Sequence, residues 1–198
     1  MKKIFIGVLL TGILCCIGIL FWYTDYQYAL PTPVPAGYQS VKTGEHVQLG
    51  TLSLPGDGKP VLLHFFNPAC PCSRFNIKYF NSLTEKYKGK ANMVVVLMNA
   101  AKDTPTAVRK RFAIGVPVIY APELAKRCGV YSTPQAVILA KGNKLYYRGN
   151  YNLTRYCTDP KTEFAKQALD NLLNHVEQTE FQPLATRAYG CSLPECTL

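Results

Sequence analysis

The sequence predicts one α/β domain, in which helices cover both faces of a central mixed sheet, preceded by one transmembrane helix. Three observations support this prediction. The 198-residue chain opens with an uncharged apolar run, short β-prone segments then alternate with amphipathic helical patterns, and a glycine-containing hairpin link joins the last two strands. The expected parts are a cytoplasmic N-terminus (1–3), a transmembrane anchor (4–23), a linker (24–43), the folded domain (44–178) and a C-terminal tail with a cysteine pair (179–198).

The N-terminal run, residues 4–23, has no charge and is long enough to cross about 30 Å of hydrocarbon as a helix. Lys2 and Lys3 precede it, and no lysine or arginine follows before Lys42. The positive-inside rule therefore puts the N-terminus in the cytoplasm and the domain in a periplasmic or other extracytoplasmic location, with membrane lipid as a partner of the anchor. A cleaved signal peptide is the alternative, but residues 26–29 supply a poor cleavage site.

Charge and size favour one globular domain and no nucleic-acid partner. About 160 residues follow the apolar run and its linker, enough for a sizeable core. The formal net charge is +10. The basic residues fall in separate helix-like stretches without a zinc-finger or RNP-type motif, which favours solvated helix faces near anionic lipid.

The first half of the domain reads as strand, helix, strand and two more helices. Residues 60–66 form a short apolar run typical of a buried central strand, and 73–87 carry apolar side chains at helical spacing. A second buried strand is expected at 93–98. Helices are expected at 104–113, which opens on Thr-Pro, and at 122–128.

The second half reads as a hairpin and a helix. Strands at 134–140 and 144–148 are joined by three residues that include glycine, so we expect them to be antiparallel. Residues 160–176 place their apolar side chains on one helical face. The tail from Glu180 onward has no periodicity.

Two cysteines follow the first strand directly, in Asn67-Pro-Ala-Cys-Pro-Cys-Ser-Arg74. Cys70 is expected at the N-terminus of the next helix, where unpaired N–H groups and the helix dipole stabilise a thiolate and lower the thiol pKa. This position predicts a redox-active nucleophile. The alternative is a buried or disulfide-bonded cysteine without turnover.

Two segments resemble the thioredoxin superfamily: VLLHFFNPACPCSRF resembles its active-site stretch, and GVYSTPQAVIL resembles its cis-proline segment. The resemblance covers about residues 44–178 and implies a thioredoxin-like fold with a cis bond between Thr133 and Pro134 beside the nucleophile. Together with the anchor, it is closest to membrane-tethered, extracytoplasmic thiol–disulfide oxidoreductases. It implies an enzyme without a cofactor, which acts on protein thiols or disulfides and takes electrons from a membrane or soluble thiol donor.

The chain departs from the family pattern, because Cys70-Pro-Cys72-Ser73 replaces Cys-x-x-Cys. Residues two apart do not share a helix face, so a Cys70–Cys72 disulfide requires an unwound loop and is easily reduced. Either this pair is an oxidising, isomerase-like bond, or each cysteine has its partner elsewhere.

Cys157 is the candidate partner outside this motif. The second hairpin strand returns to the active-site end of the sheet, so Cys157 is expected at the rim of the site. We favour it slightly over Cys72 as the thiol that resolves a mixed disulfide on Cys70. Arg155 is expected to help to hold a thiolate, and Cys128 to be a small buried hydrophobe.

The tail contains Cys191 and Cys196, which enclose four residues around a proline. The spacing predicts a local structural disulfide between them. The alternative is a mobile resolving pair that passes electrons to the site.

Two other functions compete with disulfide exchange. Cys70 and Cys72 are soft ligands for Cu(I), which suggests a Cu(I)-binding thioredoxin-like metallochaperone for oxidase assembly, although none of His46, His64 and His175 is an obvious further ligand. A peroxiredoxin-like peroxidase is less favoured, because the residues before Cys70 do not match its Pro-x-x-x-Thr/Ser-x-x-Cys pattern. Disulfide exchange requires no metal.

Overall fold

The computed structural model describes residues 2–26, 29–50, 52, 57–99, 104–176 and 180–193. In these residues the main sheet has five strands in the order β3-β2-β1-β5-β6. β1, β2 and β3 are parallel, whereas β5 is antiparallel to both β1 and β6. The strands are β1 (Val61–Phe66), β2 (Asn92–Leu97), β3 (Val118–Tyr120), β5 (Gln135–Ala140) and β6 (Lys144–Gly149). The predicted mixed sheet and hairpin are confirmed, and β3 is an addition.

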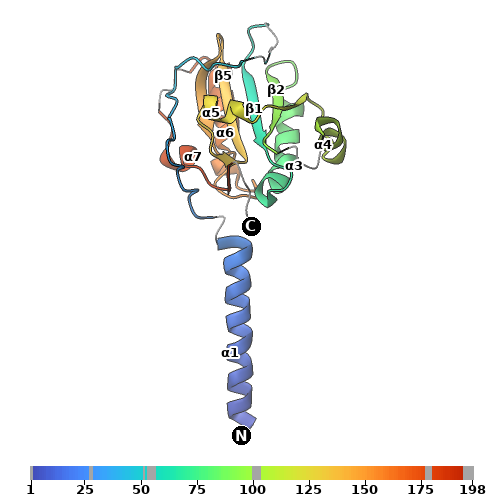
Figure 1. Cartoon of the computed structure of the whole chain (residues 1–198), viewed down its shortest axis with the longest axis vertical. Helices are drawn as coiled ribbons and strands as arrows, with labels where there is room; N and C mark the ends of the chain where they lie inside the picture. Colours follow the sequence, from blue (N-terminus) through green and yellow to red (C-terminus); the bar gives the residue numbers. More distant parts are fainter. Residues whose placement is uncertain are drawn as a thin grey trace.

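Helices cover both faces of this sheet, as predicted (Figure 1). One face packs against α3 (Pro71–Lys86), α4 (Pro105–Arg111) and α6 (Phe164–Leu173). The other face packs against α5 (Glu123–Cys128). All six residues of β1 are buried because both of its faces are covered, which explains its continuous apolar sequence.

The last helix is shorter than predicted. Residues 160–162 form a 3₁₀ turn, η2 (Pro160–Thr162), in which the Asp159 side chain accepts a hydrogen bond from the Lys161 N–H. Glu163, with φ −72° and ψ 62°, then leaves the helical region before α6 begins. The α-helix therefore starts at Phe164, although its buried face lies where the periodicity places it.

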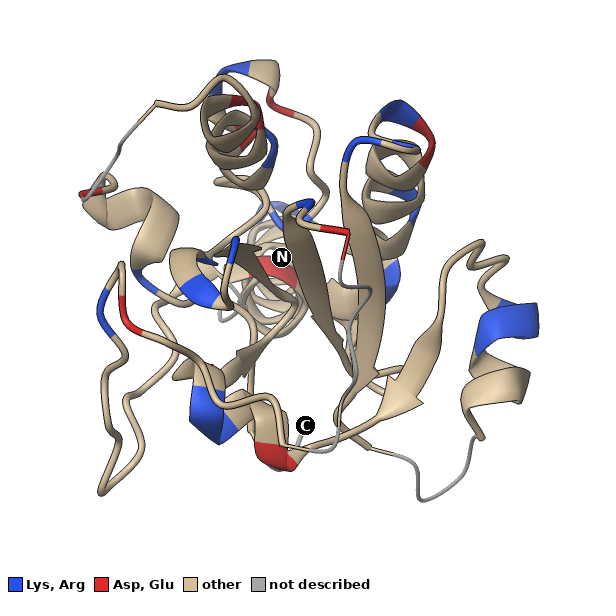
Figure 2. Cartoon of the chain, turned by 90° about the horizontal axis from the view of Figure 1, so that it is seen from above, with Lys and Arg blue, Asp and Glu red and all other residues tan. Residues whose placement is uncertain are grey.

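The N-terminal segment is a helix that projects from the domain. α1 (Lys2–Phe21) and the π-helical turn η1 (Trp22–Tyr26) bury none of their residues, and Figure 1 shows α1 projecting from the domain. This segment is the one helix among the described residues that is long and apolar enough to cross a membrane. Figure 2 shows Lys and Arg on several separate helices and loops of the domain.

A second, two-stranded sheet lies in the C-terminal part of the fold. It pairs β4 (Ser132–Thr133), just before Pro134, with β7 (Cys191–Ser192), and it is antiparallel. The short helix α7 (Pro183–Thr186) precedes β7. None of these three elements is predicted from the sequence, because each is too short to show a hydrophobic period.

Candidate redox site

Cys70 caps the N-terminus of α3, as predicted. Its backbone is extended (φ −78°, ψ 123°), and Pro71 occupies the first helical turn, where a missing N–H costs no hydrogen bond. The turn before it is fixed by Asn67, whose carbonyl oxygen accepts from the Cys70 N–H at 3.0 Å and whose side chain accepts from the Ala69 N–H at 3.0 Å. Cys70 therefore lies at the positive end of a 16-residue helix, where a thiolate is stabilised.

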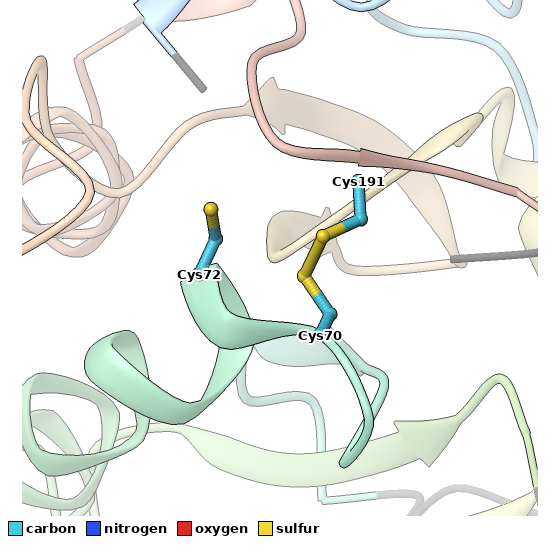
Figure 3. Close-up of side chains that lie close together, drawn as sticks. All are labelled: Cys70, Cys72 and Cys191. Carbon is cyan, nitrogen blue, oxygen red and sulfur yellow. A yellow bond between two sulfur atoms is a disulfide. The ribbon is translucent and has the colours of Figure 1, made fainter. Parts of the chain in front are cut away.

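Cys70 forms a disulfide with Cys191, across 121 residues of sequence (Figure 3). Their Cα atoms are 6.3 Å apart. The expected local disulfide between Cys191 and Cys196 is therefore wrong for this structure, and Cys196 lies outside the described residues. The physical reason is that the tail is not a separate loop: β7 pairs with β4 and carries Cys191 to the helix N-terminus.

Backbone hydrogen bonds hold the tail on both sides. On one side, Thr133 pairs with Cys191, and the Leu193 N–H donates to the Tyr131 carbonyl oxygen at 3.0 Å. On the other side, the linker residue Thr32 donates its N–H to the Ala188 carbonyl oxygen at 2.8 Å. The tail therefore lies as a strand between the linker and β4.

Gly190 permits the tail to approach the backbone of Thr133 closely. Its φ is +129°, a conformation that L side chains rarely adopt. A Cβ at this position would collide with the Thr133 carbonyl oxygen. The residue before Cys191 therefore has to be glycine for the tail to lie in this register.

The Thr133–Pro134 peptide bond is cis, as the sequence resemblance implies. The Cys70 sulfur lies 3.5 Å from the Thr133 carbonyl oxygen, so β4 and Cys70 are in contact. Both Thr133 and Cys70 are fully buried under the tail. The tail thus covers the sulfur that is expected to react.

Cys72 completes a group of three sulfur atoms. It lies in the first turn of α3, is 1% exposed and is outside the disulfide. The sulfurs of Cys70, Cys72 and Cys191 all lie within 4.8 Å of one another. Figure 3 shows the Cys72 side chain projecting from α3 on the same side as the disulfide. Cys72 therefore stands beside the bond that Cys70 forms with Cys191.

Cys157 is close to the site but does not belong to this group among the described residues. It follows β6 with φ +55°, and its sulfur accepts a hydrogen bond from the Asn76 amide at 3.0 Å. Burial raises the pKa of the Cys157 thiol to about 11. Cys157 and Cys72 line the same pocket, about 410 Å³ in volume, as the predicted return of the hairpin requires.

Arg155 connects this pocket to the end of the N-terminal helical segment. Its guanidinium forms an ion pair with Asp25 of η1 at 2.7 Å and lies 5.3 Å from the centre of the Phe75 ring. It is also near enough to Cys72 for their charges to interact. Arg155 therefore contributes positive charge beside the sulfur group while bonded to Asp25.

Cys128 is the small buried hydrophobe that the sequence predicts. It is fully buried at the end of α5, and burial raises the pKa of its thiol to about 12. It packs in the hydrophobic cluster on the α5 face of the sheet.

The disulfide between Cys70 and Cys191 is the feature that the sequence does not predict, although the sequence leaves the tail cysteines open as an alternative resolving pair. The only local signals are Gly190 directly before Cys191, and Ser73 where the family has its second cysteine. Neither signal predicts a contact between residues 121 positions apart. A strand of two residues is too short to show alternating apolar and polar side chains, so its pairing register cannot be inferred from the sequence.

Comparisons with solved structures show the fold. An uncharacterized conserved protein from Geobacillus kaustophilus aligns with a TM-score of 0.62 and 21% identity, over 82% of this chain and 97% of that one. A thioredoxin-like protein in the oxidized form aligns with a TM-score of 0.51 and 18% identity, over 74% and 98%. Peroxidoxin BcpB from Mycobacterium tuberculosis aligns with a TM-score of 0.52 and 15% identity, over 70% and 100%.

The domain therefore has the thioredoxin-like fold that its motifs imply. No curated protein matches the chain. A family model matches residues 39–195, which span the whole folded domain and most of the tail. The chain belongs to this family, described as Domain of unknown function (DUF6436).

Proposed function

We propose that this chain is a membrane-anchored thiol–disulfide oxidoreductase that acts on protein disulfides outside the cytoplasmic membrane through Cys70. The Cys70–Cys191 disulfide is the observation that carries this proposal. It joins the cysteine at the N-terminus of α3 to a strand beside the cis-proline. A purely structural disulfide gains nothing from that position, whereas a reactive one does, because its leaving thiolate is stabilised there.

The reaction needs two of the three cysteines in the group. In the reduced protein, the Cys70 thiolate attacks one sulfur of a substrate disulfide, forms a mixed disulfide and releases the other sulfur as a thiolate. The Cys191 thiolate then attacks the Cys70 sulfur, releases the second substrate thiolate and forms the Cys70–Cys191 disulfide. Two electrons have passed to the substrate, and a membrane or soluble thiol donor restores the protein dithiol.

The way in which the tail is bound favours a polypeptide substrate over a small-molecule disulfide. Cys191 reaches Cys70 because its backbone pairs with β4 as an antiparallel strand. A cysteine-containing segment of a protein can pair with β4 in the same way once the tail has left, since main-chain hydrogen bonds do not depend on its sequence. The tail and the substrate strand therefore use β4 in turn: the substrate strand pairs while the mixed disulfide forms, and the returning tail displaces it as Cys191 attacks the Cys70 sulfur.

The location rests on the N-terminal segment. α1 carries no charge after Lys2 and Lys3, and the position of these two lysines before the apolar run favours a cytoplasmic N-terminus and an outer domain. The pocket beside Cys72 is lined in part by Asp25 and Tyr26 of η1, so the redox site faces the end of the anchor. This arrangement favours partners at the membrane surface.

Reduction of insulin disulfides by the full-length protein in detergent, with a thiol donor, tests the proposal. We expect turnover by the wild type, its loss in Cys70→Ser, and its retention in Cys128→Ser, which removes a buried thiol on the opposite face of the sheet. Turnover by Cys70→Ser equal to that of the wild type would refute the assignment of the nucleophile.

A further inference from the structure

The three sulfurs at the N-terminus of α3 form a compact, buried ligand set. Cys70, Cys72 and Cys191 are at most 9% exposed and form a separate cluster in the core. Their sulfurs lie within 4.8 Å of one another. A metal ion about 2.3 Å from each of three sulfurs at the corners of a triangle holds them roughly 4 Å apart. The group therefore needs only a small adjustment to surround one ion once the disulfide is reduced.

The composition of the group selects the metal. Among the described residues, no histidine or carboxylate completes it. Zn²⁺ in structural sites takes four ligands in a tetrahedron, and hard cations require oxygen ligands. Thiolates are soft ligands that select Cu(I), which accepts a low coordination number.

The surroundings stabilise the charge of such a complex. Three thiolates and one Cu(I) carry a net charge of −2, and the N-terminus of the 16-residue helix α3 presents its positive dipole to Cys70 and Cys72. The Arg155 guanidinium, which also forms an ion pair with Asp25, lies near Cys72. Burial of the sulfurs excludes water and competing ligands.

We propose that the reduced protein binds one Cu(I) through Cys70, Cys72 and Cys191, and that the Cys70–Cys191 disulfide excludes the metal. A thiol donor supplies two electrons and two protons to open the disulfide. Binding then displaces three thiol protons, and copper remains Cu(I). When a substrate disulfide accepts two electrons from Cys70 and Cys191 and is released as two thiols, the Cys70–Cys191 disulfide forms and removes two of the three ligands. The redox state therefore decides whether copper is held. The site shares Cys70 and Cys191 with the proposed exchange reaction, so bound copper blocks turnover, but copper binding itself requires no turnover.

Anaerobic competition of the reduced, full-length protein in detergent with a chromogenic Cu(I) chelator tests this inference. All variants carry Cys15→Ser and Cys16→Ser, which remove the thiols of α1. We expect one Cu(I) per chain in the reduced protein and none in the disulfide form. Removing an outer-shell partner of a metal site already costs roughly 10–100-fold in affinity, so Cys70→Ser, Cys72→Ser and Cys191→Ser should each weaken binding at least that much. Cys128→Ser is the matched control and should bind as the wild type does.

A second variant keeps the test independent of folding and of turnover. Cys191→Met retains a soft sulfur but cannot form the disulfide, so it should recover much of the affinity that Cys191→Ser loses and should bind copper under oxidising conditions as well. X-ray absorption should show three sulfur neighbours in the wild type and two in Cys191→Ser. Wild-type affinity in Cys191→Ser, or tighter binding of Zn²⁺ than of Cu(I), would overturn the proposal. Insulin turnover by the metal-free protein, measured in parallel, shows whether the redox function fails separately.

Discussion

Cys70 and Cys157 are two cysteines at the same end of the sheet, yet their surroundings differ. Cys70 caps a 16-residue helix, touches the carbonyl group beside the cis-proline and is bonded to Cys191. Cys157 lies in a loop after β6, accepts a hydrogen bond from Asn76 and has a pKa that burial raises to about 11. Proximity to the site therefore does not by itself give a cysteine surroundings that stabilise a thiolate. A helix N-terminus and a partner strand are the features that distinguish Cys70.

The largest expected effect is a difference in alkylation of the reduced protein. With a pKa of about 11, about 0.1% of Cys157 is thiolate at pH 8, and its rate should rise about tenfold per pH unit up to that pKa. Cys70 should already react at pH 7, faster than the same cysteine in denatured protein. Rates are measured by peptide mass spectrometry after pulses of iodoacetamide. Equal pH profiles for the two cysteines would remove the distinction between them.

The Cys191→Ser variant shows how much the bond to Cys191, which Cys157 lacks, contributes to the free energy of unfolding. The disulfide closes a loop of 121 residues, so its loss should lower the free energy of unfolding by about 5 kcal/mol. Urea unfolding of the oxidised wild type and the variant measures this difference, which should vanish when both are reduced. If the two reduced proteins still differed in their free energies of unfolding by the same amount, the effect would come from packing of the tail and not from the disulfide.

The same variant separates the candidate resolving thiols. After reaction with a model disulfide, the adduct on Cys70 should accumulate in Cys191→Ser, because the partner that the structure places at Cys70 is missing. It should not accumulate in Cys157→Ser, whose thiol lies outside the sulfur group. Accumulation in Cys72→Ser or Cys157→Ser alone would instead support Cys72 or Cys157 as the resolving thiol. The trapped adduct is quantified by intact mass.

His64 provides a smaller effect away from the sulfurs. Its ring is fully buried, stacks on Phe80 with ring centres 4.4 Å apart and shares a 2.7 Å hydrogen bond with the Tyr151 hydroxyl. Burial lowers the pKa of His64 to about 3. Its unfolded pKa is about 6.5, so the unfolded chain gains a proton that the folded protein does not bind.

The free energy of unfolding is therefore unaffected by His64 above pH 6.5, and protonation of His64 in the unfolded chain lowers it as the pH falls toward 3. The loss should be about 1.4 kcal/mol per pH unit, and it should be absent in His64→Phe. Urea unfolding between pH 7 and 4 measures the difference between the two proteins, in which the contributions of other groups cancel. Parallel pH profiles would show that His64 is protonated in the folded state.

The sequence predicts the central fold because its signals are local. The apolar run of β1, the helical stripe of α3 and the glycine-containing hairpin between β5 and β6 each show a period or a turn within a few residues. The position of Cys70 follows from the first two. The location of Cys157 near Cys72 follows from topology, because the second strand of a hairpin returns to the end at which the first began.

The partner of Cys70 was not predictable from such signals. β4 and β7 have two residues each, and their pairing depends on a glycine with positive φ and on contacts with the linker at Thr32. The short Cys191–Cys196 spacing suggested a local bond, whereas the fold carries Cys191 to a sulfur 121 residues away. Contacts of this separation are fixed by tertiary packing and not by sequence pattern.

Disulfide mapping of the native, full-length protein tests the central claim most directly. The protein is alkylated without reduction, digested and analysed by mass spectrometry under oxidised conditions and again after a thiol donor has acted. We expect a peptide pair that links Cys70 to Cys191 in the oxidised sample, with Cys72, Cys128 and Cys157 as thiols, and its disappearance after reduction. A link between Cys191 and Cys196, or between Cys70 and any other cysteine, would contradict the account.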